Sequence, residues 1–161
     1  MNKIKLFVPL GTQKFPFGRI ITALNSLVKQ NKYSPEEIVM QSALYPIKPN
    51  FTAFKLIPND DFNRYMNEAE VIVTHSGVNS IISCMKIGKP LVICPRLRKY
   101  GEHIDNHQME IATLMNDKYN VLVCTDMKDL APLVEQAKTH KYKPWISHRE
   151  ELLDAINKLI I

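Results

Sequence analysis

The feature that most constrains this chain is one stretch, residues 71–108, in which two apolar runs flank a polar loop and a helical pattern. The first run, residues 71–73, is short and wholly apolar, as is typical of a buried parallel strand. Residues 75–80 form a small polar loop, and the helical pattern that follows stops at Gly88. A second apolar run, residues 91–94, completes a strand–loop–helix–strand unit. The loop enters the helix at its N-terminus, where free N–H groups and the helix dipole favour an anion, most often a phosphate.

The rest of the chain alternates strand and helix patterns in the same way. We expect strands at residues 4–10, 37–41, 51–57, 71–73, 91–94 and 121–124. Helical patterns occupy residues 17–30, 59–69, 103–116, 126–138 and 147–159, besides the one that follows the 75–80 loop and stops at Gly88. This alternation predicts an α/β fold, a Rossmann-like doubly wound parallel sheet with the strand order 3-2-1-4-5-6. In that order the loops after the first and fourth strands face each other, so Gly11 and Thr12 should lie opposite residues 75–80.

The chain has 161 residues, which is the size of one domain. We treat residues 1–161 as a single domain with a C-terminal segment, residues 144–161, that begins near the sole tryptophan, Trp145. Trp145 packs in the core or anchors an interface. The last helical pattern packs on the parent domain or contacts a partner. Its apolar stripe consists of Leu152, Leu153, Ile156, Leu159 and Ile160.

Composition and charge indicate which partners and which cellular location we expect for the chain. The net charge is +5, with 21 Lys and Arg against 16 Asp and Glu, and this favours anionic partners such as nucleotide diphosphates. No basic run is interleaved with aromatic residues, so nucleic acid is not an expected partner. Cys84, Cys94 and Cys124 form no Cys-x-x-Cys pair and are expected to be buried thiols in a reducing cytoplasm. We expect a cytoplasmic chain, because no signal peptide and no apolar run of about 20 residues is present.

Several other site classes are disfavoured. The first strand is not followed by Gly-x-Gly-x-x-Gly and no P-loop motif occurs, which argues against dinucleotide and P-loop nucleotide binding. Glu102, His103, Asp105 and His107 resemble a metal cluster, and the two histidines would share a helix face. Helix capping and sugar binding explain the same residues, so no metal is expected. Three basic residues follow a strand end and face either an anion or a partner, or lie in a solvated loop: Arg96, Arg98 and Lys99.

Several motifs, in order along the chain, carry a family resemblance. His-Ser-Gly-Val-Asn-Ser at 75–80, Gly-Lys-Pro at 88–90 and Asp-Asn-His-Gln at 105–108 resemble the nucleotide-sugar motif of GT-B glycosyltransferases. This motif lies in their C-terminal half, the glycosyltransferase family 28 C-terminal domain. Residues 11–17 and 95–103 resemble, more narrowly, the small donor-binding subunits of two-component glycosyltransferases of bacterial capsule and exopolysaccharide synthesis. Those subunits are related to the catalytic subunit of the eukaryotic dolichol-linked N-acetylglucosaminyltransferase.

The resemblance implies a UDP-sugar site built from three groups of residues. The residues implied to bind the donor diphosphate are Gly11, Thr12, His75, Ser76, Gly77, Asn79 and Ser80. The resemblance places Ser83 and Pro95 beside the ribose and the nucleoside. The residues implied to bind the sugar are Asn106, His107 and Gln108. Ser83 departs from the family, which usually has a glutamate there to hold the ribose hydroxyls. Taken alone, Asn79 and Ser80 would be helix caps and His75 a satisfied histidine at a strand end.

The resemblance also implies an activity. The chain would be the donor-binding, catalytic subunit of an inverting UDP-sugar glycosyltransferase that transfers a hexose, with galactose favoured, to a polyprenyl-diphosphate-linked sugar in capsule or exopolysaccharide synthesis. A membrane-attached partner subunit would bind the acceptor, supply the general base and recruit the chain to the inner face of the membrane. No cofactor is implied, since the UDP-sugar is a substrate.

Two other interpretations remain open. The first is a non-catalytic activating or scaffold subunit with weak or no nucleotide binding, which the serine at position 83 leaves open. The second is an unrelated flavodoxin-like or Rossmann domain, against which the missing glycine fingerprint argues.

Overall fold

A six-stranded, all-parallel sheet forms the centre of the molecule, with the strand order β3-β2-β1-β4-β5-β6. The computed structural model describes residues 3–160, apart from the side chains of residues 150–154 and 160. The strands are β1 (Leu6–Pro9), β2 (Ile38–Gln41), β3 (Thr52–Phe54), β4 (Val71–Thr74), β5 (Leu91–Ile93) and β6 (Leu122–Val123). The predicted Rossmann-like class and strand order are confirmed.

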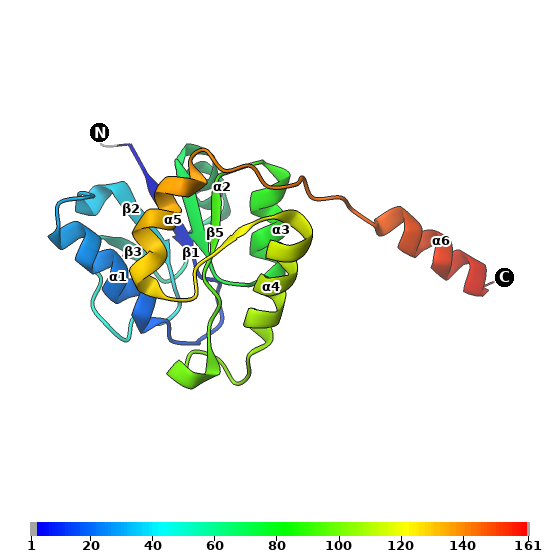
Figure 1. Cartoon of the computed structure of the whole chain (residues 1–161), viewed down its shortest axis with the longest axis horizontal. Coiled ribbons are helices and arrows are strands. Elements are labelled where there is room, and N and C mark those ends of the chain that lie inside the picture. Colours follow the sequence, from blue (N-terminus) through cyan, green and yellow to red (C-terminus); the bar gives the residue numbers. More distant parts are fainter. Residues whose placement is uncertain (1–2, 161) are drawn as a thin grey trace.

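Helices cover both faces of this sheet (Figure 1). The helices on one face are α1 (Gly18–Lys29) and α5 (Leu130–Ala137). Those on the other face are α2 (Asn59–Glu68), α3 (Val78–Lys86) and α4 (His107–Tyr119). Three short 3-10 turns are η1 (Pro35–Glu37), η2 (Arg98–Tyr100) and η3 (Met127–Asp129). None of the helices in the described part of the chain has the length and apolar composition that crossing a bilayer requires.

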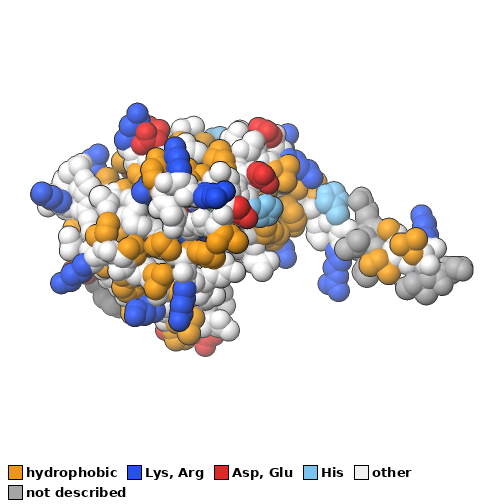
Figure 2. Space-filling model, turned by 90° about the horizontal axis from the view of Figure 1, so that it is seen from below, with side chains coloured by type: hydrophobic (Ala, Val, Ile, Leu, Met, Phe, Trp, Pro, Cys, Tyr) orange, Lys and Arg blue, Asp and Glu red, His pale blue; other side chains and the backbone are white. Residues whose placement is uncertain are grey.

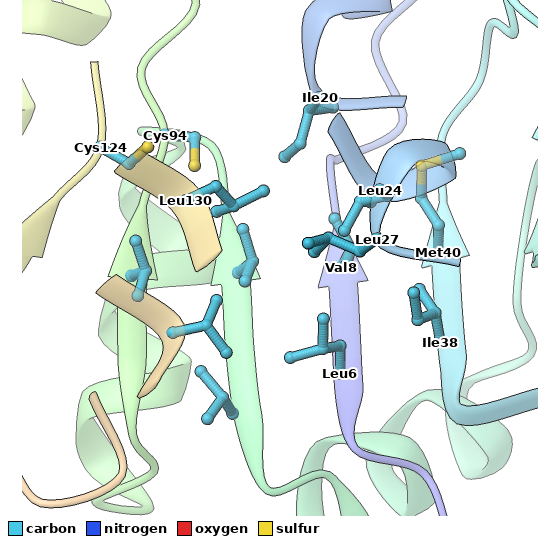
Figure 3. Close-up of a cluster of buried hydrophobic side chains, with 14 of the residues drawn as sticks. Leu6, Val8, Ile20, Leu24, Leu27, Ile38, Met40, Cys94, Cys124 and Leu130 are labelled. Carbon is cyan, nitrogen blue, oxygen red and sulfur yellow. The ribbon is translucent and has the colours of Figure 1, made fainter. Parts of the chain in front are cut away.

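Continuous apolar runs form the strands because the sheet is buried on both faces. In β1, Leu6 and Val8 face α1 and α5, whereas Phe7 faces the opposite helices. Figure 3 shows Leu6 and Val8 beside α1, which contributes Ile20, Leu24 and Leu27 to the same cluster. Burial of each such side chain contributes about 1.5–3 kcal/mol to folding. The three cysteines are free and buried, as expected.

The loops that follow the strands all lie at the carboxyl edge of the sheet, since parallel strands end on the same side. The loop after β5 is longer than predicted: we expected a helix from residue 103, but α4 begins at His107 and residues 101–106 form turns. The reason is that Glu102 points inward and is only 2% exposed. Its carboxylate is bonded to Arg19 and to the Leu97 N–H, and these bonds hold this part of the loop against the domain.

A buried ion pair joins this loop to α1. Glu102 accepts hydrogen bonds from Arg19 Nε at 2.8 Å, from Arg19 Nη2 at 3.0 Å and from the Leu97 N–H at 3.0 Å. Arg19 also donates to the backbone oxygens of Thr125 at 2.8 Å and Pro95 at 3.4 Å. This one pair therefore ties α1 to the segments that follow β5 and β6.

The chain after α5 crosses the face that carries α3 and α4. Tyr142 Oη donates to the Lys89 carbonyl at 2.6 Å, and the Trp145 ring packs on Tyr119 with centroids 5.4 Å apart. Trp145 thus packs on the domain itself, in agreement with one of the two expected roles.

The last helix, α6 (Arg149–Ile160), stands away from the body of the molecule (Figure 1). Two residues of its predicted apolar stripe, Ile156 and Leu159, are 42% and 87% exposed. The side chains of Leu152, Leu153 and Ile160 lie outside the described residues. The described part of the stripe therefore does not pack on the parent domain.

Removal of Glu102 should destabilise the fold strongly. In Glu102→Ala, Arg19 keeps its partly buried guanidinium but loses its carboxylate partner, so we expect the free energy of unfolding to fall by about 3–5 kcal/mol in urea titrations. The matched control is Asp61→Ala, which breaks the half-exposed Asp61–Arg64 pair and should change the free energy of unfolding far less, because solvent screens this pair. Equal losses in the two variants would contradict a structural role for the buried pair.

Candidate functional site

The strand order reverses between β1 and β4, and sheets of this kind form a ligand crevice at that point. The two loops that border it meet: a Cβ atom built on Gly11 would lie 3.0 Å from Nε2 of His75. Gly11 has φ +81°, a conformation that favours glycine, and no larger side chain fits there without strain. The predicted convergence of the loops after the first and fourth strands is therefore observed.

The N-terminus of α3 forms one wall of this crevice. Its N-cap residue is Gly77 and no side chain caps the helix, so the N–H groups of residues 78–80 are available to a ligand. Asn79 is exposed and Ser80 is half-buried, and neither caps the helix as considered from the sequence. Ser83 is exposed one turn further on, on the same helix face as these two residues.

His75 lies over the glycines in a defined protonation state. Its Nδ1 is 2.9 Å from Arg96 Nη1 and 3.2 Å from Gln108 Nε2. A guanidinium only donates, so Nδ1 must accept and the ring proton sits on Nε2. Burial, together with the charges of Arg96 and His103, lowers the pKa of His75 to about 3. The ring is therefore neutral, and no described residue accepts from its Nε2–H group.

The burial of Arg96 was not revealed by the sequence, although facing an anion was one of its expected roles. Its side chain is only 2% exposed, so the solvated-loop interpretation is wrong for Arg96, although Arg98 and Lys99 are exposed. Figure 2 views the molecule from the carboxyl edge of the sheet, where Lys and Arg side chains lie among exposed hydrophobic ones. The only sequence signal for Arg96 was its position after a strand end, and this position does not distinguish a buried arginine from a solvated one.

The Arg96 guanidinium joins three loops but has no acidic partner. Nη2 donates to the carbonyls of Leu10 at 3.1 Å and Phe15 at 3.5 Å, and Cζ lies 5.2 Å from the centre of the Phe17 ring. No described carboxylate forms an ion pair with it, and Nε is buried without a hydrogen-bond partner. Burial lowers the pKa of Arg96 to about 10, so it stays charged at neutral pH. A buried cation without a counter-charge favours an anion in the crevice.

Gln108 connects the two central loops from α4. It is 6% exposed, and its Oε1 accepts from the Arg96 N–H at 2.9 Å and from the Ser76 N–H at 3.3 Å. Its Nε2 group faces His75, so both ends of the amide are already bonded. The contact between Gln108 and a sugar stays a prediction.

The other implied site residues are placed as follows. Thr12 is exposed at the crevice, whereas Pro95 is buried behind it. Ser76 is buried, and its hydroxyl has no hydrogen-bond partner among the described residues. Asn106 Oδ1 accepts from the Arg98 N–H at 3.1 Å, and the exposed His107 ring lies 3.3 Å from Glu110.

The acidic and histidine residues of this loop do not gather around one point. Glu102 is engaged by Arg19, whereas His103 Nδ1 lies 3.1 Å from Asp105 and its ring packs on Phe15 at 4.5 Å. Among the side chains that the structure describes, which leave out those of residues 150–154 and 160, no three His, Cys, Asp or Glu are arranged as metal ligands.

A side chain at position 77 should displace the histidine. In Gly77→Ala the new Cβ would lie 2.5 Å from Cε1 and 2.6 Å from Nε2 of His75, so the ring must move and lose its bonds to Arg96 and Gln108. We expect a loss of about 1–3 kcal/mol in the free energy of unfolding and changed His75 ring signals in NMR spectra. Gly18→Ala is the control, since its Cβ would meet nothing closer than 3.4 Å. Unchanged His75 signals in Gly77→Ala would contradict the close packing.

The low pKa of His75 predicts a pH dependence of stability. As the pH falls from the ordinary value of 6.5 toward 3, the unfolded chain binds a proton that the folded chain does not. His75 should therefore lower the free energy of unfolding by up to about 1.4 kcal/mol per pH unit in this window. His75→Gln lacks this contribution, so urea titrations between pH 4 and 7 should give it a shallower slope than the natural chain. Identical slopes would show that His75 titrates normally.

Known structures share this fold. The NMR solution structure of ALG13 covers 90% of this chain and 90% of that chain, with a TM-score of 0.56 and 17% identity. The crystal structure of Acinetobacter baumannii MurG covers 98% of this chain but 50% of that chain, with a TM-score of 0.57 and 16% identity. At such identities the likeness concerns the fold alone. The class of protein is thus an α/β domain equivalent to one half of a GT-B glycosyltransferase.

The family follows from the sequence match. Residues 6–158 match the glycosyltransferase family 28 C-terminal domain, so the chain belongs to this family. The resemblance inferred from the motifs at the crevice is confirmed at this level.

The relatives correct the narrower expectation. The chain is 28% identical to the UDP-N-acetylglucosamine transferase subunit ALG13 of Candida albicans, over 63% of this chain and 34% of that protein. It is 24% identical to the human protein of the same name, over 74% of this chain and 11% of that protein. The chain thus spans about a third or less of these two relatives. The expected galactose-transferring subunit of bacterial capsule synthesis is wrong, because the relatives are N-acetylglucosamine transferase subunits.

Proposed function

We propose that this chain binds UDP-N-acetylglucosamine and forms the donor half of a glycosyltransferase whose acceptor half is a separate chain. Two findings support the division into halves. The domain corresponds to 50% of MurG, and the relatives are named as subunits of a UDP-N-acetylglucosamine transferase. The acceptor half would bind the acceptor sugar and bring the chain to the membrane surface.

The observation that carries the proposal is the convergence of three anion-binding features in one crevice. The uncapped N-terminus of α3 offers N–H groups, His75 offers its Nε2–H, and Arg96 contributes a buried positive charge. A diphosphate carries the negative charge that this set lacks, and helix N-termini commonly bind phosphates. We therefore assign the donor diphosphate to this crevice, with Gly11 and Gly77 permitting its close approach.

The same features suit departure of the nucleotide. When the sugar leaves, negative charge grows on the β-phosphate, and donors already held in place stabilise that charge without rearrangement. His75 serves here as a donor only, because its Nδ1 accepts from Arg96 and its Nε2 already carries the proton. It therefore does not remove the proton of the acceptor hydroxyl, and we assign that base to the acceptor half.

Titration calorimetry of the purified chain tests the proposal. We expect saturable binding of UDP-N-acetylglucosamine and weaker binding of UDP-galactose. Asn79→Ala and Ser80→Ala should each weaken binding by about fivefold, since each removes one hydrogen bond of about 1 kcal/mol. Asn63→Ala, an exposed position on α2 away from the crevice, is the matched control and should bind as the natural chain does.

Two results would count against the proposal. Binding that is equal in the control and in both α3 variants would place the nucleotide elsewhere. Absence of binding both in the isolated chain and after co-expression with its acceptor half would favour a scaffold subunit.

A further inference from the structure

We infer that Gln108 and Arg96 are positioning residues that act on the bound diphosphate through His75, by fixing its ring proton on Nε2. This inference rests on the proposed function, since the ligand is the donor diphosphate. It differs from the sugar contact expected for Gln108 from the motif. The role is to select one of the two neutral forms of the imidazole ring.

The orientation of the Gln108 amide is determined by its surroundings. Its Oε1 lies within hydrogen-bond distance of two backbone N–H groups, those of Ser76 and Arg96, and both require an acceptor. An inverted amide would direct its NH₂ group at these two donors. The NH₂ group must therefore face His75, where it donates to Nδ1 at 3.2 Å.

Arg96, in the segment after β5, also requires Nδ1 of His75 to accept a hydrogen bond. Its Nη1 lies 2.9 Å from Nδ1 and has no form that accepts a hydrogen bond. Two donors thus meet one ring nitrogen, which must carry a lone pair. The proton is left on Nε2, on the side of the ring that faces Gly11 and Gly77.

The charged groups around His75 oppose its protonation. Arg96 lies on the segment after β5, and His103 lies in the turns before α4. Glu102, the nearby carboxylate, is paired with Arg19 and the Leu97 N–H. The N-terminus of α3 also presents positive partial charge. The ring therefore stays a neutral donor across the neutral pH range.

The nitrogen of the His75 ring that carries the proton decides whether the ring attracts or repels an anion in the crevice. With the proton on Nε2, the ring donates to a phosphate oxygen. With the proton on Nδ1, a lone pair on Nε2 would face that oxygen and repel it. Gln108 and Arg96 therefore convert a side chain of two neutral forms into a fixed donor.

The first experiment needs no ligand. Nitrogen-15 NMR of the histidine rings in the natural chain, with His75 assigned by its loss in His75→Gln, reports which nitrogen carries the proton. We expect the Nε2–H form, unchanged from pH 5 to pH 8. A ring protonated on Nδ1, or one that titrates in this range, would overturn the inference.

The second experiment uses Gln108→Glu. A carboxylate still accepts from the N–H groups of Ser76 and Arg96, but it places an acceptor opposite Nδ1. The new carboxylate should also draw the Arg96 guanidinium away from Nδ1, so we expect His75 to take a proton on Nδ1 and to titrate between pH 5 and 8. The affinity for UDP-N-acetylglucosamine, whose diphosphate keeps its charge in this range, should fall about tenfold from pH 5.5 to pH 8 in the variant. The affinity of the natural chain should be constant over the same range.

Gln136→Glu is the matched control, because it makes the same change at an exposed site on α5. It should leave the His75 signals and the pH profile unchanged. A Gln108→Glu variant that binds with the constant profile of the natural chain would make Gln108 a purely structural residue and overturn the inference. If the natural chain binds no nucleotide either alone or with its acceptor half, the proposed function fails, whereas the NMR measurement still decides the state of His75.

Discussion

The arrangement of this site depends on one buried guanidinium. Arg96 holds the loop after β1 through the carbonyls of Leu10 and Phe15, and it holds the loop after β4 through His75. Its own backbone N–H is held by Gln108 from α4. Four segments that are distant in sequence are thus joined around a single charge. That charge has no carboxylate partner among the described residues, so the interaction that organises the loops also makes the crevice attractive to anions.

The pair of Arg19 and Glu102 has the complementary role. It is fully compensated, and it attaches α1 to the same segment after β5 that carries Arg96. The two arginines therefore have different roles, although they lie close together in the fold. One is neutralised by a carboxylate and stabilises the framework, whereas the other keeps its charge available. The proposed diphosphate site would use both, since the paired arginine supports the segment that holds the unpaired one.

Much of the fold could be predicted from the sequence, because a parallel sheet buried on both faces produces continuous apolar runs at regular intervals. The loops at Gly11 and Gly77 could be predicted as well, since the strand order places them at one crevice. The burial of Arg96 and the bonds of Gln108 could not, because they depend on contacts between segments far apart in the chain. The late start of α4 has the same origin in Glu102. The expectation of galactose was wrong because it rested on the family resemblance alone, and residues 75–80 carry no information about the hexose.

The uncompensated charge of Arg96 has a consequence for the empty protein. A ligand that binds only the folded state adds RT ln(1 + [L]/Kd) to its stability, which is about 2.7 kcal/mol at a concentration one hundred times the Kd. An anion bound beside Arg96 would add this gain at a buried cation that no described carboxylate pairs with. Supply of the nucleotide sugar would then influence how long the chain survives in the cell. On the proposed function, scarcity of that nucleotide sugar would lower the abundance of the protein through proteolysis of its unfolded fraction.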